Sequence, residues 1–171
     1  MSTPRIVPLD DDVAPLVAEA SPSWAAALPA WRESMAAGRS TLLVALTDTI
    51  AVDVAAGRGV PSGVRPAAVG IAQLLHEAVP EVRNVGVLES HRGRGIGTAL
   101  MAEAERLAAP AGRLRLGVGL DNPAARRLYE RLGYRAKGEV ETTPYDYVDA
   151  DGATRSATET DEWMERELRS R

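Results

Sequence analysis

The sequence predicts an α/β domain in which strands and helices alternate along the chain. Short apolar runs of strand length are followed by stretches whose apolar residues recur at helical spacing, and Gly, Pro or Asn stands at most of the boundaries. With 45% hydrophobic and 26% charged residues, the composition is that of a folded, soluble protein. A length of 171 residues fits one domain, so we expect residues 1–171 to form a single domain.

The composition also excludes several kinds of site. The chain has no cysteine, which excludes disulfides, thiolate catalysis and Cys-based zinc sites. The two histidines, His76 and His91, have no partner at metal-ligand spacing, so we expect no metal site. We find no long apolar run that could span a membrane and no signal peptide, so we expect a cytoplasmic protein without a membrane partner. The many alanines, with Lys137 the only lysine, are typical of a GC-rich bacterial genome.

The first half of the chain is predicted to supply three strands and two helices. Two Ala-rich stretches have helical character, and Gly38 follows the second as a helix-stop signal. The stretch Gly57–Pro66 is rich in Gly, Pro and Ser, so we predict a mobile loop there. The predicted elements are a strand at Arg5–Leu9, helices at Asp11–Ala20 and Ser23–Ala37, and strands at Thr41–Leu46 and Ala67–Leu75.

The second half is predicted to alternate strands with two amphipathic helices. Strands are expected at Glu81–Leu88 and Leu114–Val118, and the helix between them should end at Pro110. The apolar face of that helix comprises Ile96, Leu100, Ala104 and Leu107. The tail, Tyr134 to Leu168, is expected to form two strands around the polar connection Asp149-Ala150-Asp151-Gly152.

The second amphipathic helix carries clear boundary signals. Asn122 can cap its N-terminus, Pro123 suits its first turn, and Gly133 stops it. Its apolar stripe comprises Ala125, Leu128, Tyr129 and Leu132.

Charge is unevenly distributed around a net charge of −4. The segment Glu81–Gly138 holds 11 basic and 6 acidic residues, and the rest of the chain holds 9 basic and 18 acidic ones. A basic block inside an acidic chain suits a local anionic ligand better than a nucleic-acid track, so we expect no nucleic-acid partner. On charge alone, chance clustering of surface arginines would explain the block equally well.

A glycine-rich loop, Arg92-Gly93-Arg94-Gly95-Ile96-Gly97-Thr98, lies between a predicted strand and a predicted helix. Amides at a helix N-terminus form an anion site suited to phosphate, and glycines let the backbone approach the ligand. A dinucleotide-binding fingerprint would need Gly or Ala where Thr98 stands, and no Walker G-K-(S/T) is present. A glycine-rich turn without a ligand is the alternative for the loop taken alone.

This loop resembles the pyrophosphate loop of the GNAT acetyltransferase superfamily, whose pattern is (Q/R)-x-x-G-x-(G/A). Arg92, Gly95 and Gly97 fill the pattern in order, whereas Glu89 stands where a proline is frequent. The segment Asn122–Tyr134 is similar to a later signature of the same superfamily, N-x-x-A-x-x-L-Y-E-x-x-G-(F/Y), and fills it without a gap. The two motifs stand in the family's order, separated by a helix and a strand, so the chain resembles a GNAT N-acetyltransferase.

The resemblance implies a GNAT fold, with a mixed, mostly antiparallel sheet of about six to seven strands that is flanked by helices and splayed between strands four and five. It also implies acetyl-CoA as co-substrate, with its pyrophosphate on the loop amides and its pantetheine between the splayed strands. The cofactor-binding residues that follow are Val87, Leu88, Arg92, Gly93, Arg94, Gly95, Ile96, Gly97, Thr98, Asn122 and Ala125.

Acetyl transfer to an amine needs a group that protonates the thiolate and a donor for the oxyanion. The resemblance assigns the first role to Tyr129, although its place on an apolar stripe is also that of a core aromatic residue. It assigns the second role to a backbone amide near Val87 or Leu88.

Glu81 is the candidate base, because some members of the family have a catalytic glutamate at the start of this strand. Side chains alternate along a strand, so Glu81 is expected to share a face with Arg83, Val85 and Val87. The alternatives for this role are Glu77, His76, Glu89 and a water chain, or an exposed carboxylate with no role.

The expected partners are acetyl-CoA and an unidentified amine acceptor, a small molecule or a peptide, with the protein a monomer or a homodimer. Asp10-Asp11-Asp12 and the acidic tail favour a cationic amine or are simply solvated surface. A catalytically silent module that binds or senses acetyl-CoA would explain both motifs as well. A nucleotide-binding domain would explain only the glycine loop.

Overall fold

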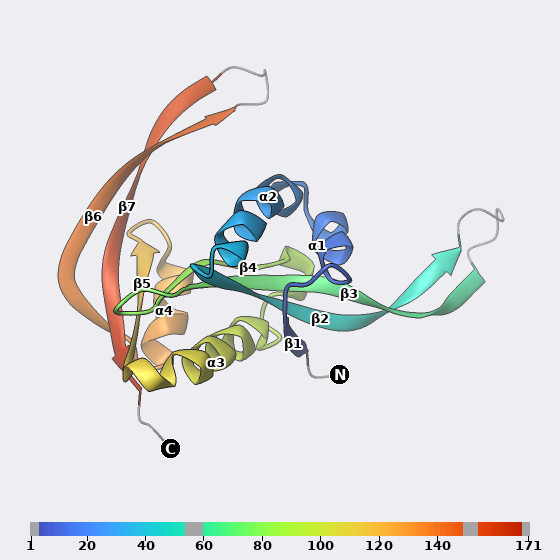
Figure 1. The fold of residues 1–171 in the computed structure, drawn as a ribbon, viewed down its shortest axis with the longest axis horizontal. Helices are drawn as coiled ribbons and strands as arrows, with labels where there is room; N and C mark the ends of the chain where they lie inside the picture. The colour runs from blue at the N-terminus through green and yellow to red at the C-terminus, as the bar shows by residue number, and fades with distance from the viewer. Residues whose placement is uncertain (1–3, 54–59, 149–153, 169–171) are drawn as a thin grey trace.

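A seven-stranded mixed sheet forms the centre of this computed structural model, which describes residues 4–53, 60–148 and 154–168 (Figure 1). Across the sheet the strand order is β1-β2-β3-β4-β5-β7-β6. The strands are β1 (Arg5–Pro8), β2 (Ser40–Asp53), β3 (Val60–Leu75), β4 (Glu81–Val87), β5 (Arg113–Gly119), β6 (Arg135–Val148) and β7 (Thr154–Glu167). The helices are α1 (Ala14–Ala20), α2 (Pro22–Ala36), α3 (Ile96–Ala108) and α4 (Pro123–Arg131), with single turns η1 (Glu89–His91) and η2 (Ala109–Ala111).

The sheet opens between β4 and β5. Among the described residues, these are the only neighbouring strands that run parallel. These strands pair only at their starts, Glu81 with Arg115 and Val82 with Leu116. β5 then stays paired with β7 along its whole length, so β4 and β5 diverge beyond Val82. The predicted mixed, mostly antiparallel sheet that is splayed between strands four and five is therefore confirmed.

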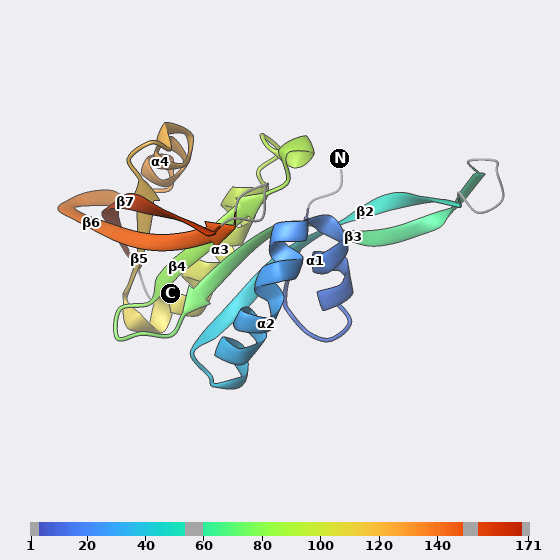
Figure 2. The same cartoon turned by 90° about the horizontal axis from the view of Figure 1, so that it is seen from above.

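Helices cover both faces of the sheet, as Figure 2 shows. α1 and α2 pack on one face, where Leu42 and Val44 of β2 are buried with Trp31. α3 lies on the opposite face, over Leu43 and Ala45 of the same strand, and α4 packs near β5 in the same apolar cluster. This alternation of buried residues follows from the period of two along a strand, because both faces of β2 are covered.

A glycine in β3 brings α3 close to the sheet. A Cβ atom at Gly70 would lie only 2.9 Å from Cγ2 of Ile96 and 3.2 Å from Cδ1 of Leu100. Any larger residue would push the first turn of α3 away from the sheet. Gly70 therefore helps to fix the position of the glycine-rich loop that precedes α3.

A β-bulge at Asn84 changes the predicted faces of β4. Arg83 pairs with Gln73 and Gly86 with Ile71, so two residues of β4 stand opposite Ala72, and Asn84 has a positive φ of 53°. The extra residue reverses the alternation of side chains. The prediction that Glu81 and Arg83 share a face with Val85 and Val87 is therefore wrong. The two valines face the core under α3. Glu81, which pairs with Leu75 before the bulge, lies on the face of the sheet that carries α2.

The predicted loop at Gly57–Pro66 is in part a strand. Residues 57–59 lie outside the described residues, as does the predicted Asp149–Gly152 connection, but residues 60–66 belong to β3 and pair with β2. β4 pairs with β3 only from Gly70 onward, so this part of β3 is an edge, where prolines are tolerated. The Gly and Pro content that indicated a loop is thus compatible with an edge strand.

Two helix predictions also need correction. Leu107 was expected on the buried face of α3 but is 37% exposed, because the buried row of the last turns runs through Ala104 and Ala108. α1 begins at Ala14, three residues later than predicted, because the Asp10 carboxylate accepts hydrogen bonds from the next turn and holds it apart from the helix.

Candidate functional site

The glycine-rich loop leads from η1 directly into α3. Gly93 and Gly95 have φ values of 73° and 79°, in the left-handed region that favours glycine. The N–H of Ala99 donates to the carbonyl of Gly95 at 3.0 Å, which closes the first turn of the helix. The three N–H groups between these two residues have no acceptor within the helix, and they lie at the positive end of its dipole. The loop thus has the geometry of an anion site.

A cleft of about 730 Å³ begins at this loop and extends along β4 to α4. All but one of the predicted cofactor-binding residues line it: Val87, Leu88, Arg92, Gly93, Gly95, Ile96, Gly97, Thr98, Asn122 and Ala125. Tyr129 lies in its wall, and so do residues that the motifs do not contain, among them Trp24 of α2 and Arg131 of α4. No local sequence signal indicates Trp24, because α2 is distant in the chain from both motifs.

The two arginines of the loop have different surroundings. Nε of Arg92 donates to the carbonyl oxygen of Val87 at 3.3 Å, so this side chain folds back on the end of β4. Arg94 instead lines a separate cavity of about 260 Å³ beside α1. The left-handed glycines on either side of Arg94 turn its side chain away from the larger cleft. Among the predicted cofactor-binding residues, Arg94 shares this cavity only with Leu88, which lines the larger cleft as well.

The backbone at the end of β4 distinguishes the two candidate oxyanion donors. The N–H of Leu88 donates to the carbonyl of Val69 at 2.9 Å and is therefore occupied. Along an antiparallel pair, successive residues direct their N–H and C=O groups to opposite sides. The N–H of Val87 consequently points away from β3, toward the side where β5 has diverged.

α4 carries the polar residues of the second motif. Asn122 caps this helix as predicted, since its Oδ1 accepts the N–H of Ala125 at 3.1 Å. Tyr129 is buried, with 6% of its surface exposed, and its ring contacts Tyr134 edge to face at a centroid distance of 6.0 Å. Burial raises the pKa of Tyr129 to about 12. No hydrogen bond joins its hydroxyl to another residue in the described part of the chain.

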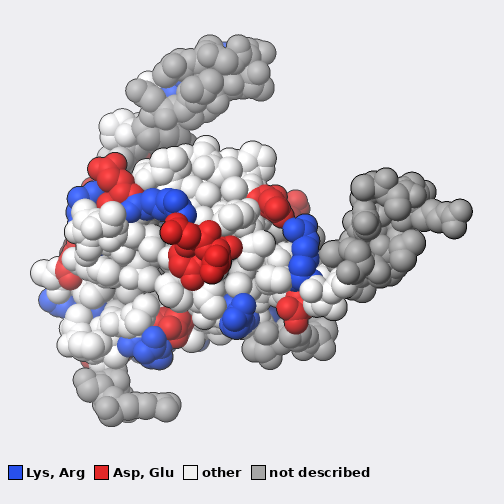
Figure 3. Space-filling model, turned by 45° about the vertical axis from the view of Figure 1, so that its right-hand side comes forward, with Lys and Arg blue, Asp and Glu red and all other residues white. Residues whose placement is uncertain are grey.

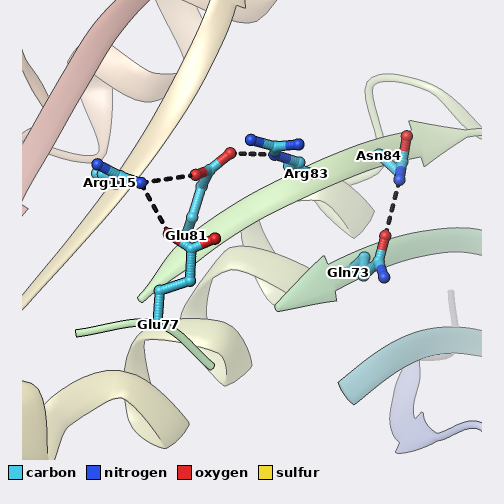
Figure 4. A network of polar contacts seen from close by, with 6 residues as sticks. All are labelled: Gln73, Glu77, Glu81, Arg83, Asn84 and Arg115. Atoms are coloured by element: carbon cyan, nitrogen blue, oxygen red, sulfur yellow. Dashed lines mark hydrogen bonds and ion pairs between the residues drawn. The ribbon is translucent and has the colours of Figure 1, made fainter. Parts of the chain in front are cut away.

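Glu81 lies at the centre of a charged network, shown in Figure 4. Only 1% of Glu81 is exposed. One of its carboxylate oxygens accepts from Nε of Arg83, and the other accepts from Arg115 at 3.1 Å. Arg115 also forms an ion pair with Glu77 at 2.9 Å. The hydrogen bond to Glu81 raises the pKa of Arg83. Both oxygens of Glu81 are thus engaged by guanidinium groups.

The bulge residue is held from the other side by amide side chains. Nδ2 of Asn84 donates to Oε1 of Gln73 at 2.9 Å, and Nε2 of Gln73 donates to the hydroxyl of Ser40 at 3.1 Å. Because Gln73 and Ser40 are buried, this chain of bonds satisfies polar groups that would otherwise destabilise the fold.

The other candidate bases lie in three different places. His76 is within hydrogen-bond distance of the Thr41 hydroxyl and the Gly38 carbonyl, so its ring links the ends of β2 and β3. Glu77 belongs to the network of Arg115, and Glu89 lines the cleft beside the glycine-rich loop. Glu89 thus shares the first cleft with Tyr129, whereas Glu81 lines another cleft that also includes Tyr129.

A second cleft of about 480 Å³ adjoins the first. The two share four lining residues: Val85, Asn122, Ala125 and Tyr129. The second cleft is bounded by β4 on one side and by β5, β6 and β7 on the other, and its lining is rich in charged residues: Glu81, Arg83, Glu141, Glu159 and Asp161. Sequence reasoning did not single out the last three. Acidic residues at alternate positions of the tail strands were the signal that could have found them.

Charges of both signs are mixed elsewhere on the surface. Figure 3 shows Asp and Glu side chains gathered near the middle of one face, with Lys and Arg side chains around them. Within the described ranges, no group of three or more His, Asp or Glu residues has an arrangement that could hold a metal ion. No helix in that part of the chain has the length and apolar character needed to cross a membrane.

Comparisons with known proteins agree with the motifs. The sequence is 39% identical over 72 residues to an uncharacterized N-acetyltransferase of Methanocaldococcus jannaschii, a match that covers 41% of this chain and 32% of that protein. The chain thus matches about a third of the length of that relative. A GNAT family acetyltransferase of Elizabethkingia anophelis, solved with acetyl-CoA bound, has 17% identity and a TM-score of 0.61 over 98% of this chain and 100% of that one.

An acetyltransferase of Bacillus subtilis in complex with CoA has 19% identity and a TM-score of 0.56, over 97% of this chain and 99% of that one. At these identities the two solved structures establish the fold. The sequence profile of the Acetyltransferase (GNAT) family matches residues 15–134, which include the loop, both clefts' shared wall and the second motif. The chain therefore belongs to the GNAT family of acetyltransferases.

Proposed function

We propose that this protein transfers the acetyl group of acetyl-CoA to a primary amine of a small molecule or peptide. The observation that carries the proposal is the cleft that begins at the free N–H groups of α3 and reaches Tyr129, where a second cleft adjoins it. One cleft suits a donor with phosphate groups and the other an acceptor. The relatives solved with acetyl-CoA and with CoA support a CoA thioester as the donor.

The loop would bind the donor through its backbone. Pyrophosphate oxygens would accept from the N–H groups at the start of α3, an interaction that the helix dipole strengthens. Gly97 lets α4 approach the start of α3, because a Cβ atom there would lie 3.2 Å from Cδ2 of Leu128. The pantetheine would then follow β4 toward Val87, in the gap that β5 leaves open.

The acetyl group would be transferred by direct attack. The amine lone pair attacks the thioester carbonyl, a C–N bond forms, and the N–H of Val87 stabilises the oxyanion. When the intermediate collapses, the C–S bond breaks and the sulfur takes the phenolic proton of Tyr129. The amine releases a proton to a base. Transfer of a proton from the base to the phenolate then restores the phenol of Tyr129. With its pKa near 12, Tyr129 carries its phenolic proton at neutral pH.

Glu81 is our candidate for that base. It lines the second cleft with Tyr129, and no other glutamate that the sequence suggested does so. Its oxygens are held by Arg83 and Arg115, so proton removal would run through a water molecule rather than by direct contact. A water chain that needs no carboxylate is the competing account.

The test compares two glycine variants. Gly95 and Gly112 both have left-handed φ values, 79° and 74°, and no atom lies within 4 Å of a Cβ built on either. Gly95→Val and Gly112→Val therefore introduce similar backbone strain, but only the first changes the loop. We expect Gly95→Val to raise the acetyl-CoA dissociation constant at least tenfold in calorimetry, and Gly112→Val to leave it unchanged.

Turnover is measured on the wild-type protein as CoA release with a panel of primary amines. Acetylated product with any amine supports the transferase. Tight binding of acetyl-CoA without turnover of any amine would instead support the silent binding or sensing module. Equal weakening by both glycine variants would contradict the proposed binding loop.

A further inference from the structure

The second cleft has the position of an acceptor site. It meets the proposed donor cleft at Tyr129, so a molecule within it faces the place where the thioester would lie. Its walls come from five elements: β4, β5, α4, β6 and β7. The cleft is therefore a feature of the folded sheet rather than of one loop.

The charge of this cleft is strongly negative. Four carboxylates line it, against a single guanidinium group, that of Arg83. Arg83 and Arg115 already neutralise Glu81. The remaining three, Glu141, Glu159 and Asp161, form no ion pair or hydrogen bond with another residue that the structure describes. Arg83 offsets part of the charge of Glu141 and Asp161, and the rest is left for a ligand to balance.

The geometry of β6 and β7 brings these carboxylates together. Glu141 is the direct cross-strand partner of Asp161, and Thr143 is that of Glu159, so all of them share one face. Like charges in directly opposite positions destabilise a sheet. Burial and the charge of Glu141 raise the pKa of Asp161, even though Arg83 acts in the opposite direction. A positively charged group in the cleft would relieve this repulsion.

Two glycines of β5 provide the space. Asp161 is in register with Gly119, and a Cβ atom on Gly117 would lie 3.3 Å from Cβ of Asp161 and 3.5 Å from its Oδ2. Because neither glycine has a side chain, the carboxylate of Asp161 lies over the bare backbone at the floor of the cleft. Larger residues on β5 would fill this space.

Tyr129 is the independent sign that a ligand belongs here. Its side chain is more than nine-tenths buried, it lines both clefts, and its hydroxyl has no hydrogen-bond partner among the described residues. The hydroxyl oxygen is not fully enclosed by protein, so it is open to a hydrogen-bond partner from the cleft. A ligand that occupies the junction of the two clefts would supply the missing partner.

We infer that the acceptor carries at least two ammonium groups, of which one reaches Tyr129 as the free amine and another is held by Asp161, Glu141 and Glu159. The inference rests on the proposed function and names the substrate class for the same site. Acceptors with a carboxylate close to the reacting amine are disfavoured, because that carboxylate would face three unpaired acidic side chains. Simple monoamines are accepted poorly, because they leave the acidic groups unbalanced.

The experiment compares putrescine, which has two amino groups, with butylamine, which has one and the same chain length. We expect kcat/KM for the diamine to exceed that for the monoamine at least tenfold, and the excess to shrink as salt is raised. Asp161→Asn should raise KM for putrescine about tenfold, with little change in kcat and none in KM for butylamine. Glu167→Gln, on an exposed part of the same strand, is the matched control and should change neither amine.

Each outcome separates the inference from the proposed function. Equal kcat/KM for the two amines, or an Asp161→Asn variant that slows both equally, would overturn the inference and leave acetyl transfer intact. If no amine is acetylated, the proposed function fails, and calorimetry decides the inference. Putrescine that binds to the wild-type protein with CoA, and tenfold more weakly to Asp161→Asn, would support it. Absence of binding would refute it.

Discussion

At the residue scale, Tyr129 combines an apolar and a polar role. Its ring packs in the core against Tyr134, and the residue lines both clefts. Helical spacing alone favoured a core residue, whereas the family motif favoured an acid. The two predictions are compatible, because a long aromatic side chain can bury its ring and present its polar end to a cavity.

Replacing Tyr129 by Phe separates these roles. Tyr129→Phe keeps the ring, and thus most of the packing, but removes the proton donor. We expect acetyl-CoA binding close to that of the wild type and a fall in kcat of about 10²–10⁴-fold. Because the pKa of Tyr129 is about 12, the phenol stays protonated from acid to mildly alkaline pH, and the loss should be constant over that range. A variant with unchanged turnover would restrict Tyr129 to the core.

Glu81 gives a second prediction at this scale, with two readouts. If it serves as the base, Glu81→Gln should reduce turnover most at acid pH and much less at alkaline pH, where the amine loses its proton unaided. The same change breaks hydrogen bonds to Arg83 and Arg115, so the free energy of unfolding should fall by about 1–3 kcal/mol, since these arginines remain partly exposed. Reduced stability with an unaltered pH–rate profile would make Glu81 a structural residue and assign the proton to water.

At the element scale, the sequence predicts well those features that depend on residues close together in the chain. The loop before α3 and the cap of α4 depend on residues within a few positions of one another, and Asn122 caps α4 as expected. The bulge at Asn84 could not be predicted, because it depends on pairing with β3 and on the distant Gln73. Its effect is large, since one extra residue moves Glu81 to the face opposite Val87.

The length of β3 was underestimated for a related reason. Gly, Pro and Ser indicated a loop before Ala67, but pairing with β2 extends β3 back to Val60. The sequence showed an acidic tail but not the cleft that it lines, because Glu141, Glu159 and Asp161 are brought together by the register of β6 with β7. The residues that we propose for the acceptor site are thus set by tertiary pairing, whereas those proposed for the donor site are set by a short motif.

At the scale of the whole molecule, the splay divides the backbone hydrogen bonding of the sheet. β1 to β4 form one ladder and β5 to β7 another, joined in parallel only at Glu81 with Arg115 and Val82 with Leu116. Below the gap, an apolar cluster under α3 and α4 connects both parts. The proposed donor cleft has the loop of the first part on one side and α4 of the second on the other.

A donor that fills this cleft should therefore stabilise both parts together. With acetyl-CoA at about 100 times its dissociation constant, mass action adds about 2.7 kcal/mol to the free energy of unfolding. For a chain of this size, the Tm should rise by about 5–10 °C. Amide hydrogen exchange should slow both in the loop before α3 and in the first turn of α4. ADP, which lacks the pantetheine, should protect only the loop. If acetyl-CoA also protected the loop alone, the pantetheine would not lie in the gap between β4 and β5.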